Sequence, residues 1–184
     1  MILAYGYAEK IVGDGSKESE AARVLLAHAL KKCNIDASKL QINTDENGKP
    51  YFDGRSDIDF NISHSCGFVV CALSVGEGRV GVDVEREKSA IPIERQVKIS
   101  ERFFSENEKK ALADGESFVS LWTKREAYLK MTGDGFARGI GEEIPENVSF
   151  ATFVADGFVI SLCAEMPAET EFCEYKNDKW RNLK

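Results

Sequence analysis

Apolar residues in the first part of the chain follow two different periods, one of strands and one of helices. Residues 2–7 alternate and predict a first strand, and residues 58–62 predict another short one. Apolar residues recur at helical spacing over residues 19–32, and a lysine pair followed by Asn34 indicates the helix end. Residues 43–50 predict a turn with Asn-Gly at its tip.

The middle of the chain holds two apolar, β-branched runs joined by a short loop. Residues 68–75 and 79–85 flank Gly-Glu-Gly, a pattern typical of a β-hairpin. Residues 87–95 are polar and contain a proline, so they predict a crossover between two halves of the chain.

The second half repeats the mixture of helix and strand. Ser105 and Glu108 form an S-x-x-E capping box, which predicts a short helix to about residue 113. Residues 117–131 predict a longer helix that Gly-Asp-Gly at 133–135 stops. Residues 148–154, 158–164 and 171–175 predict a closing antiparallel set of strands. Each half of the chain, 1–86 and 87–184, therefore contains helix and strands in similar proportion, which predicts an α+β fold.

Composition narrows the class of function. The chain has 184 residues, 43% of them hydrophobic, and a net charge of −7, so it is an ordinary acidic globular protein. We expect no nucleic-acid partner, because that needs a basic surface, and no membrane span, because no long apolar run exists.

The cysteines indicate the redox environment. Five cysteines without a C-x-x-C pair indicate reduced thiols and a cytoplasmic protein. A zinc site of His64, Cys66 and Cys71 is an alternative, although its spacing fits no usual ligand pattern.

Two acids lie on one face of the predicted strand 79–85. Asp83 and Glu85 alternate with valines, so their carboxylates lie side by side with Cα atoms about 7 Å apart. Such a pair repels, and a hard cation such as Mg²⁺ relieves the repulsion by accepting oxygen ligands. The alternative is a solvated strand face.

A second group of candidates lies on the predicted helix 117–131. Trp122, Glu126 and Lys130 are four residues apart and form one stripe. Glu126 then offers a third acid for the metal, and Lys130 offers a cation for a phosphate. Alternatively, Glu126 and Lys130 form a surface ion pair and Trp122 lies in the core.

The segment Asn61-Ile-Ser-His-Ser65 carries the third candidate site. Ser63 and His64, in a turn before the hairpin, predict an anion cradle of hydroxyl, imidazole and backbone N–H groups. A Ser–His hydrolase dyad is the competitor, although no acid is fixed by sequence to orient the ring. The other histidine, His28, lies within the first helix and is interpreted as structural.

Taken together, six motifs over roughly residues 20–150 resemble the 4′-phosphopantetheinyl transferases, in order and spacing. They are Gly48-Lys-Pro50, Phe60-Asn-Ile-Ser-His-Ser65, Gly81-Val-Asp-Val-Glu85, Arg102-Phe-Phe-Ser105 with Glu108, Leu121 to Lys130, and Gly133-Asp-Gly135. The match is to the surfactin-synthetase-activating type, a monomer of two similar halves. This resemblance implies two α+β halves, 1–86 and 87–184, related by a pseudo-twofold axis, with the active site in the cleft between them.

The resemblance implies a role for each matching residue. Asp83, Glu85 and Glu126 match Mg²⁺ ligands, and Glu126 and Lys130 match the catalytic pair. The positions that match coenzyme A contacts are Arg23, Lys49, Pro50, Ser63, His64 and Arg86, with Ser63, His64 and Arg23 on the 3′-phosphate. Two positions depart from the pattern. Arg125 stands where the family usually has lysine, and Glu87 stands where a phosphate-contacting threonine or similar residue is often seen.

The implied reaction moves 4′-phosphopantetheine from coenzyme A to a serine of an apo carrier protein, with Glu126 taking the serine proton. A basic surface of Lys109, Lys110, Lys124 and Arg125 is expected to dock the acidic carrier. Two alternatives stay open: a non-catalytic relative that binds coenzyme A or a carrier, and a Mg²⁺-dependent phosphohydrolase. The carrier itself is not predicted.

Overall fold

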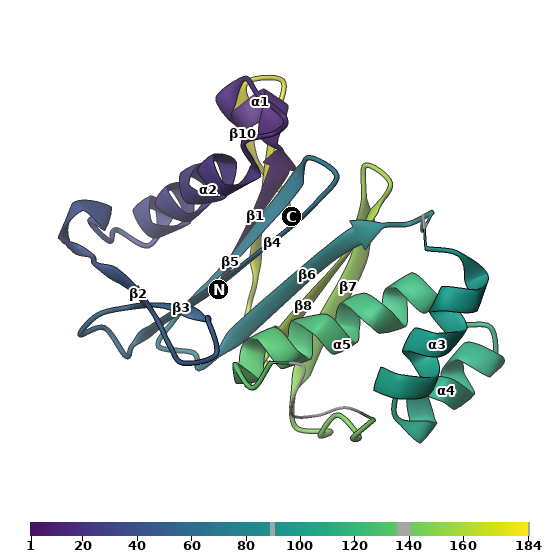
Figure 1. Cartoon of the computed structure of the whole chain (residues 1–184). Coiled ribbons are helices and arrows are strands. Elements are labelled where there is room, and N and C mark those ends of the chain that lie inside the picture. Colours follow the sequence, from purple (N-terminus) through teal and green to yellow (C-terminus); the bar gives the residue numbers. More distant parts are fainter. Residues whose placement is uncertain (89–90, 136–140, 184) are drawn as a thin grey trace.

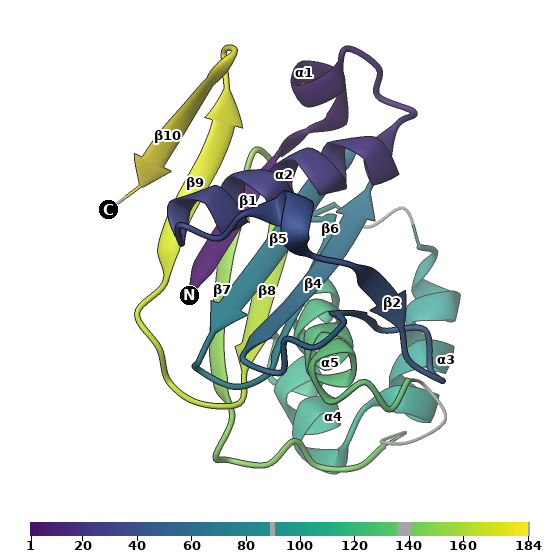
Figure 2. The same cartoon turned by 90° about the vertical axis from the view of Figure 1, so that its left-hand side faces the viewer.

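The protein is built of four layers, in which two sheets lie between helices. The structure is a computed structural model that describes residues 1–88, 91–135 and 141–183. Figure 1 shows α5 beside β6 and β8, and Figure 2 shows α2 lying across β1, β4 and β5. In chain order the elements are β1 (Ile2–Tyr7), α1 (Ala8–Val12), α2 (Glu18–Lys32), the 3₁₀ turn η1 (Ala37–Lys39), β2 (Ile42–Thr44), β3 (Pro50–Phe52), β4 (Ile58–Ser65), β5 (Phe68–Val75), β6 (Val80–Arg86), α3 (Ile93–Phe103), α4 (Glu106–Ala113), α5 (Phe118–Thr132), β7 (Ser149–Ala155), β8 (Phe158–Ala164), β9 (Glu171–Lys176) and β10 (Lys179–Leu183).

The first sheet has five strands in the order β10-β9-β1-β5-β4. Alternation along β1 divides its side chains between two cores, because successive residues point to opposite faces. Ile2 and Ala4 pack with α2, whereas Leu3 and Tyr5 pack against the second sheet. The sheet is therefore buried on both faces in its middle.

The second sheet has three strands in the order β6-β8-β7, all antiparallel. The valines of β6 face the first sheet, and α5 covers the other face through Ala127 and Met131. Gly133, with φ of 75°, ends α5 as the sequence predicts, because glycine adopts the left-handed conformation without strain. The α+β fold is confirmed.

The pairing of the strands differs from the prediction in two places. The predicted hairpin of residues 68–75 and 79–85 is wrong, because β5 pairs with β1 and β4, whereas β6 pairs with β8 in the other sheet. The closing set is also wrong in part, because β9 joins the first sheet in parallel with β1. β6 therefore lies in the second sheet with β7 and β8, whereas β9 and β10 lie in the first sheet with β1, β4 and β5.

Two elements replace predicted loops. The C-terminal end of the predicted crossover 87–95 lies in α3, which begins at Ile93 after Pro92, and residues 89–90 lie outside the described part. Residues 63–65 continue β4 and do not form a turn. The capping box of Ser105 and Glu108 is confirmed at the start of α4.

A seam of side chains joins the facing edges of the two sheets, β4 and β6. Every second residue of β4 donates to or accepts from β6. Asp59 and Asn61 accept the N–H groups of Val80 and Val82 at 2.8 and 2.9 Å. Ser63 and Ser65 donate to Asp83 and Glu85 at 2.8 and 2.9 Å. The acids of β6 are therefore held from the neighbouring sheet.

Two further features concern the class of protein. All five cysteines are unpaired thiols. Within the described ranges, no helix combines the length and the apolar character that crossing a membrane requires.

Candidate functional site

The two predicted acids of β6 lie beneath α5. Gly81, Asp83 and Glu85 share the face opposite the valines, as strand alternation predicts. A Cβ atom on Gly81 would lie 2.9 Å from the Met131 Cα and closer still to the Ala127 carbonyl oxygen. The missing side chain lets α5 rest on the backbone of β6, and this contact brings the helix acid within reach of Asp83.

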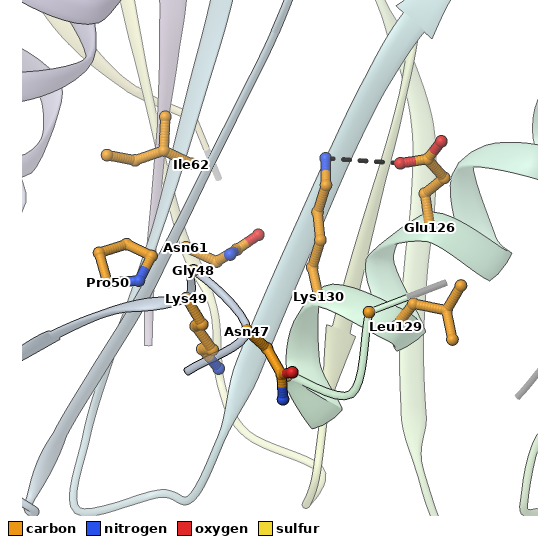
Figure 3. Close-up of a pocket in the computed structure, with 11 residues that line it drawn as sticks. Asn47, Gly48, Lys49, Pro50, Asn61, Ile62, Glu126, Leu129 and Lys130 are labelled. Atoms are coloured by element: carbon orange, nitrogen blue, oxygen red, sulfur yellow. Dashed lines mark ion pairs between the residues drawn. The ribbon is translucent and has the colours of Figure 1, made fainter. Parts of the chain in front are cut away.

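Lys130 links the acids of the helix and the strand. Its ammonium donates to Asp83 Oδ1 at 2.6 Å and to Ser63 Oγ at 3.0 Å, and lies 3.8 Å from Glu126 Oε2. Figure 3 shows Lys130 extending from α5 with its tip directed at the Glu126 carboxylate. The predicted surface ion pair is therefore part of a half-buried cluster that spans both sheets.

Burial and neighbouring charge perturb Glu126. Desolvation first, and then the Asp83 and Glu85 carboxylates, raise the pKa of Glu126 from 4.5 to about 7, against the opposing effect of Lys130. A carboxyl with a pKa near neutrality can exchange a proton with a substrate at physiological pH. Because the charges of Asp83 and Glu85 act on the pKa of Glu126, the three carboxylates interact electrostatically.

A cavity of about 260 Å³ adjoins the cluster (Figure 3). Glu126 and Lys130 form one wall, and Lys49, Pro50 and Ile62 lie opposite. A second cavity shares the last two residues and continues toward α2. Its lining includes the following residues: Ser19, Ala22, Arg23, Leu26, Pro50, Phe60, Ile62 and His64. Pro50 and Ile62 line both cavities, so the one beside the acids and the one beside the first turns of α2 are neighbours.

The structure separates Ser63 from His64. The predicted turn is a strand, so these neighbours point to opposite faces of β4. Ser63 is 6% exposed and bonds to Asp83, whereas His64 Nδ1 lies 2.7 Å from Glu18 Oε2 at the start of α2. A Ser63–His64 dyad is excluded by this geometry, and only His64 shares the second cavity with Arg23.

Lys49 and Pro50 are placed differently within the same loop. Pro50 lines both cavities. The Lys49 ammonium bonds to Asp59 Oδ2 at 2.8 Å and to the carbonyl oxygens of Val80 and Met131 at 3.3 and 3.1 Å. Its charge is therefore engaged in holding the loop against β6 and the end of α5.

Arg86 lies apart from the other candidates. It follows the valines on β6, and its guanidinium stacks 5.7 Å from the centre of the Phe158 ring. The hollow around it is lined by Tyr7, Lys88 and Asp156 and shares no residue with the two cavities above. The structure therefore does not bring Arg86 to the other predicted coenzyme A residues.

Arg125 corrects the predicted docking surface. Its side chain is fully buried and forms an ion pair with Glu108, and it donates to the Glu142 carbonyl oxygen at 2.8 Å. Lys124 pairs with Glu116 at 2.7 Å. Arg125 therefore anchors α4 to α5 and offers no charge to a partner, so the basic surface is smaller than predicted.

The carboxylates of Asp83, Glu85 and Glu126 are the right kind of ligand for a hard cation, but they are not gathered around one point. Asp83 is 4% exposed, and its Oδ2 is buried without a hydrogen-bond partner among the described residues. Three carboxylates offer the oxygen ligands that Mg²⁺ prefers. In the described ranges no group of three or more His, Cys, Asp or Glu side chains is gathered closely enough to hold a metal ion, so neither the zinc alternative nor the three-acid site is preassembled.

Comparison with known proteins assigns the family. The profile described as "4'-phosphopantetheinyl transferase superfamily" matches residues 79–178, more than half of the chain. The chain belongs to this superfamily. The profile "4'-phosphopantetheinyl transferase, N-terminal" matches residues 9–76, so both parts of a transferase of the Sfp type are present.

Curated transferases resemble the chain over different shares of their length. The chain is 34% identical to psf-1 of Bacillus pumilus over 175 residues, which are 82% of this chain and 72% of that protein. It is 28% identical to Sfp of Bacillus subtilis over 179 residues, with 82% and 77% covered. It is 40% identical to gsp of Aneurinibacillus migulanus over 114 residues, with 59% of this chain covered, and the chain spans only 44% of that relative.

Sequence reasoning missed the residues that support the site. Asp59 and Asn61 hold β6, and Glu18 holds His64, yet none of them was a candidate. A signal for the first two exists in the sequence, because residues 59, 61, 63 and 65 are polar and alternate with apolar positions 58, 60 and 62. Nothing in the sequence predicts the contact of Glu18 with His64, which depends on tertiary packing.

Proposed function

We propose that the protein transfers 4′-phosphopantetheine from coenzyme A to a serine hydroxyl of an apo carrier protein and releases adenosine 3′,5′-bisphosphate. The observation that carries the proposal is the cluster of Asp83, Glu126 and Lys130, whose two helix residues line a cavity that shares Pro50 and Ile62 with a second one. Membership of the transferase family supports it. Phosphoryl transfer asks an enzyme mainly for positioning and for neutralisation of charge, which this cluster offers.

The residues of the chain divide the work of the reaction. The serine oxygen of the carrier forms a bond to the phosphorus next to pantetheine, and the bond from that phosphorus to the bridging oxygen of the pyrophosphate breaks. Glu126 takes the serine proton, since its carboxylate lines the cavity beside Lys130. Lys130 neutralises the charge that develops on the departing phosphate.

Asp83, Glu85 and Glu126 are the residues that would hold Mg²⁺. The buried, unpartnered Oδ2 of Asp83 supports this assignment. When bound, the cation would neutralise the pyrophosphate and orient it for transfer. Lys130 pairs with Asp83 and Glu126 and would share these two carboxylates with the cation.

The second cavity fits the nucleotide part of coenzyme A. Arg23 and His64 lie together in its lining and supply positive charge and hydrogen-bond donors for the 3′-phosphate. Pro50, Phe60 and Ile62 supply apolar surface for the adenine ring. Pro50 also lines the cavity beside the acids, so one substrate can span both sites.

A mass-spectrometric assay tests the function. The protein is mixed with coenzyme A, Mg²⁺ and an apo carrier protein, and the carrier is weighed; we expect a gain of one phosphopantetheine. A carrier whose serine is replaced by alanine is the matched control. Carrier binding without a gain in mass would indicate a non-catalytic relative, and breakdown of coenzyme A without carrier would indicate a phosphohydrolase. Either outcome contradicts the proposal.

Carrier docking is a separate question. We place it on the exposed part of α4, where Lys110 lies on the surface and Lys109 pairs with Glu106 at 2.7 Å. Reversing the charge of both lysines should raise the KM for the carrier and leave the KM for coenzyme A unchanged. An unchanged KM for the carrier would rule out this surface.

We propose that the protein acts as a monomer.

A further inference from the structure

Ser63 occupies a position that suits a carboxylate better than a phosphate. Its hydroxyl donates to Asp83 Oδ1 at 2.8 Å and accepts from Lys130 Nζ at 3.0 Å. The single O–H donor of Ser63 is thus used on Asp83, so in this arrangement it is not available to a phosphate oxygen. With 6% exposure, Ser63 offers little surface to a ligand in the cavity around Arg23 and His64, of whose lining it is not a part.

The hydrogen bond from Ser63 selects one oxygen of Asp83. Oδ1 receives the donors of Ser63 and Lys130, and Oδ2 is buried with no partner among the described residues. A carboxylate that is anchored through one oxygen presents the other in a fixed direction. Hydrogen bonds of this kind orient metal-binding carboxylates and tune their affinity.

The same arrangement recurs two residues along the strand. Ser65 donates to Glu85 Oε2 at 2.9 Å. Ser63 and Ser65 are separated by one residue on β4, as Asp83 and Glu85 are on β6, so each serine meets one acid. This repetition indicates a register between the two strands that places a hydroxyl beside each acid.

We propose that Ser63 is a positioning residue that orients the Asp83 carboxylate for the divalent cation, and that it does not bind the 3′-phosphate of coenzyme A. Ser65 serves Glu85 in the same way. The inference rests on the proposed function, because it concerns the cation that the transfer uses. It reverses the role that resemblance alone implies for Ser63 and leaves that of His64 unchanged.

Two measurements without turnover test the proposal. The first is the affinity of the protein for Mn²⁺, followed by electron paramagnetic resonance in the presence of coenzyme A and without carrier. We expect Ser63→Ala to weaken it by about 10-fold, the lower end of the loss usual for a residue that orients a metal ligand. Ser63→Thr keeps the hydroxyl and should restore most of the affinity. Ser74→Ala is the control, because it removes another buried hydroxyl, one without a hydrogen-bond partner in the described ranges.

The second measurement compares the affinities for coenzyme A and 3′-dephospho-coenzyme A by calorimetry. If Ser63 acts only on Asp83, Ser63→Ala changes both affinities by the same factor, whereas His64→Ala weakens coenzyme A alone. An unchanged Mn²⁺ affinity in Ser63→Ala would overturn the proposal. A loss of affinity that disappears with 3′-dephospho-coenzyme A would overturn it as well.

These tests distinguish a failure of the proposed transfer reaction from a failure of the proposed positioning role of Ser63. If the wild-type protein modifies no carrier but its Mn²⁺ affinity depends on Ser63, then the proposed transfer fails and the positioning role stands. If it modifies the carrier and Mn²⁺ affinity does not depend on Ser63, then the positioning role fails and the transfer stands.

Discussion

The packing of α5 against Gly81 makes the geometry of the site sensitive to a single substitution. Replacing Gly81 by alanine places a Cβ atom 2.9 Å from the Met131 Cα, where ordinary contacts begin at 3.4 Å. The obstructing atoms belong to the helix backbone, so no side chain can turn away. We therefore expect α5 to retreat from β6 by at least 0.5 Å at this point, the difference between these two distances.

That movement has two consequences of different size. Overpacking of this kind costs about 1–3 kcal/mol, which corresponds to a fall in Tm of several degrees for a chain of this length. The effect on turnover should be larger, because misplacing reacting groups by about 1 Å can cost about 100-fold. Lys130 and Glu126 move with the helix, whereas Asp83 stays on the strand, so the 2.6 Å contact of Lys130 with Asp83 lengthens.

Kinetics and thermal unfolding of Gly81→Ala check both consequences. We expect kcat to fall at least about 10-fold in carrier modification. The control is Gly15→Ala, where the nearest atom to a new Cβ is 3.8 Å away. A Gly81→Ala protein with wild-type Tm and wild-type kcat would refute the reasoning, because it would mean that the helix does not depend on the bare backbone of β6.

Three further predictions concern Glu126 and Arg125. Glu126→Gln should lower kcat far more than the affinity for coenzyme A, measured by calorimetry; an equal loss of both would make Glu126 a ligand without a role as base. Burial, with the help of Asp83, raises the pKa of Glu126 from 4.5 to about 7, so the metal-free folded state binds this proton more tightly than the unfolded chain. The free energy of unfolding should therefore fall as pH rises from about 4.5 to about 7, by up to about 3 kcal/mol, and denaturant titrations of Glu126→Gln should lack that fall. Arg125→Met should cost about 3 kcal/mol, because it leaves the largely buried Glu108 carboxylate without its cationic partner, whereas Arg125→Lys should keep the charge and cost less; equal Tm values for the two variants would contradict this.

The local elements of the fold follow from the sequence, whereas the partners of the strands do not. The capping box at Ser105 and the glycine after α5 determine helix ends through short-range bonds, so they are predictable. The loop of Gly76, Glu77 and Gly78 is compatible with a hairpin, and only tertiary packing sends β6 to β8. β8 is mostly apolar and is buried along its whole length, which requires a neighbour on each side.

Parts of the candidate site could be predicted where strand alternation alone determines the face on which a side chain lies. Alternation along β6 correctly puts Asp83 and Glu85 on the face opposite the valines. The prediction for Ser63 and His64 depended on a turn, and a strand of eight residues sends the two side chains in opposite directions. Arg125 was misplaced for another reason, since a buried arginine needs a partner that lies 17 residues away, and spacing does not reveal it.

The seam between β4 and β6 links the fold to the proposed chemistry. An edge strand with alternating polar residues normally faces water, but those of β4 face a second edge and replace the missing backbone ladder with side-chain bonds. The acids of the site stand on one side of this seam, and the cavity with Arg23 and His64 lies on the other. A substrate that reaches from one side to the other therefore contacts both sheets, and its binding free energy adds to the bonds that keep them together. Coenzyme A with Mg²⁺ should consequently raise the Tm of the protein more than adenosine 3′-phosphate, which is too short to reach the acids.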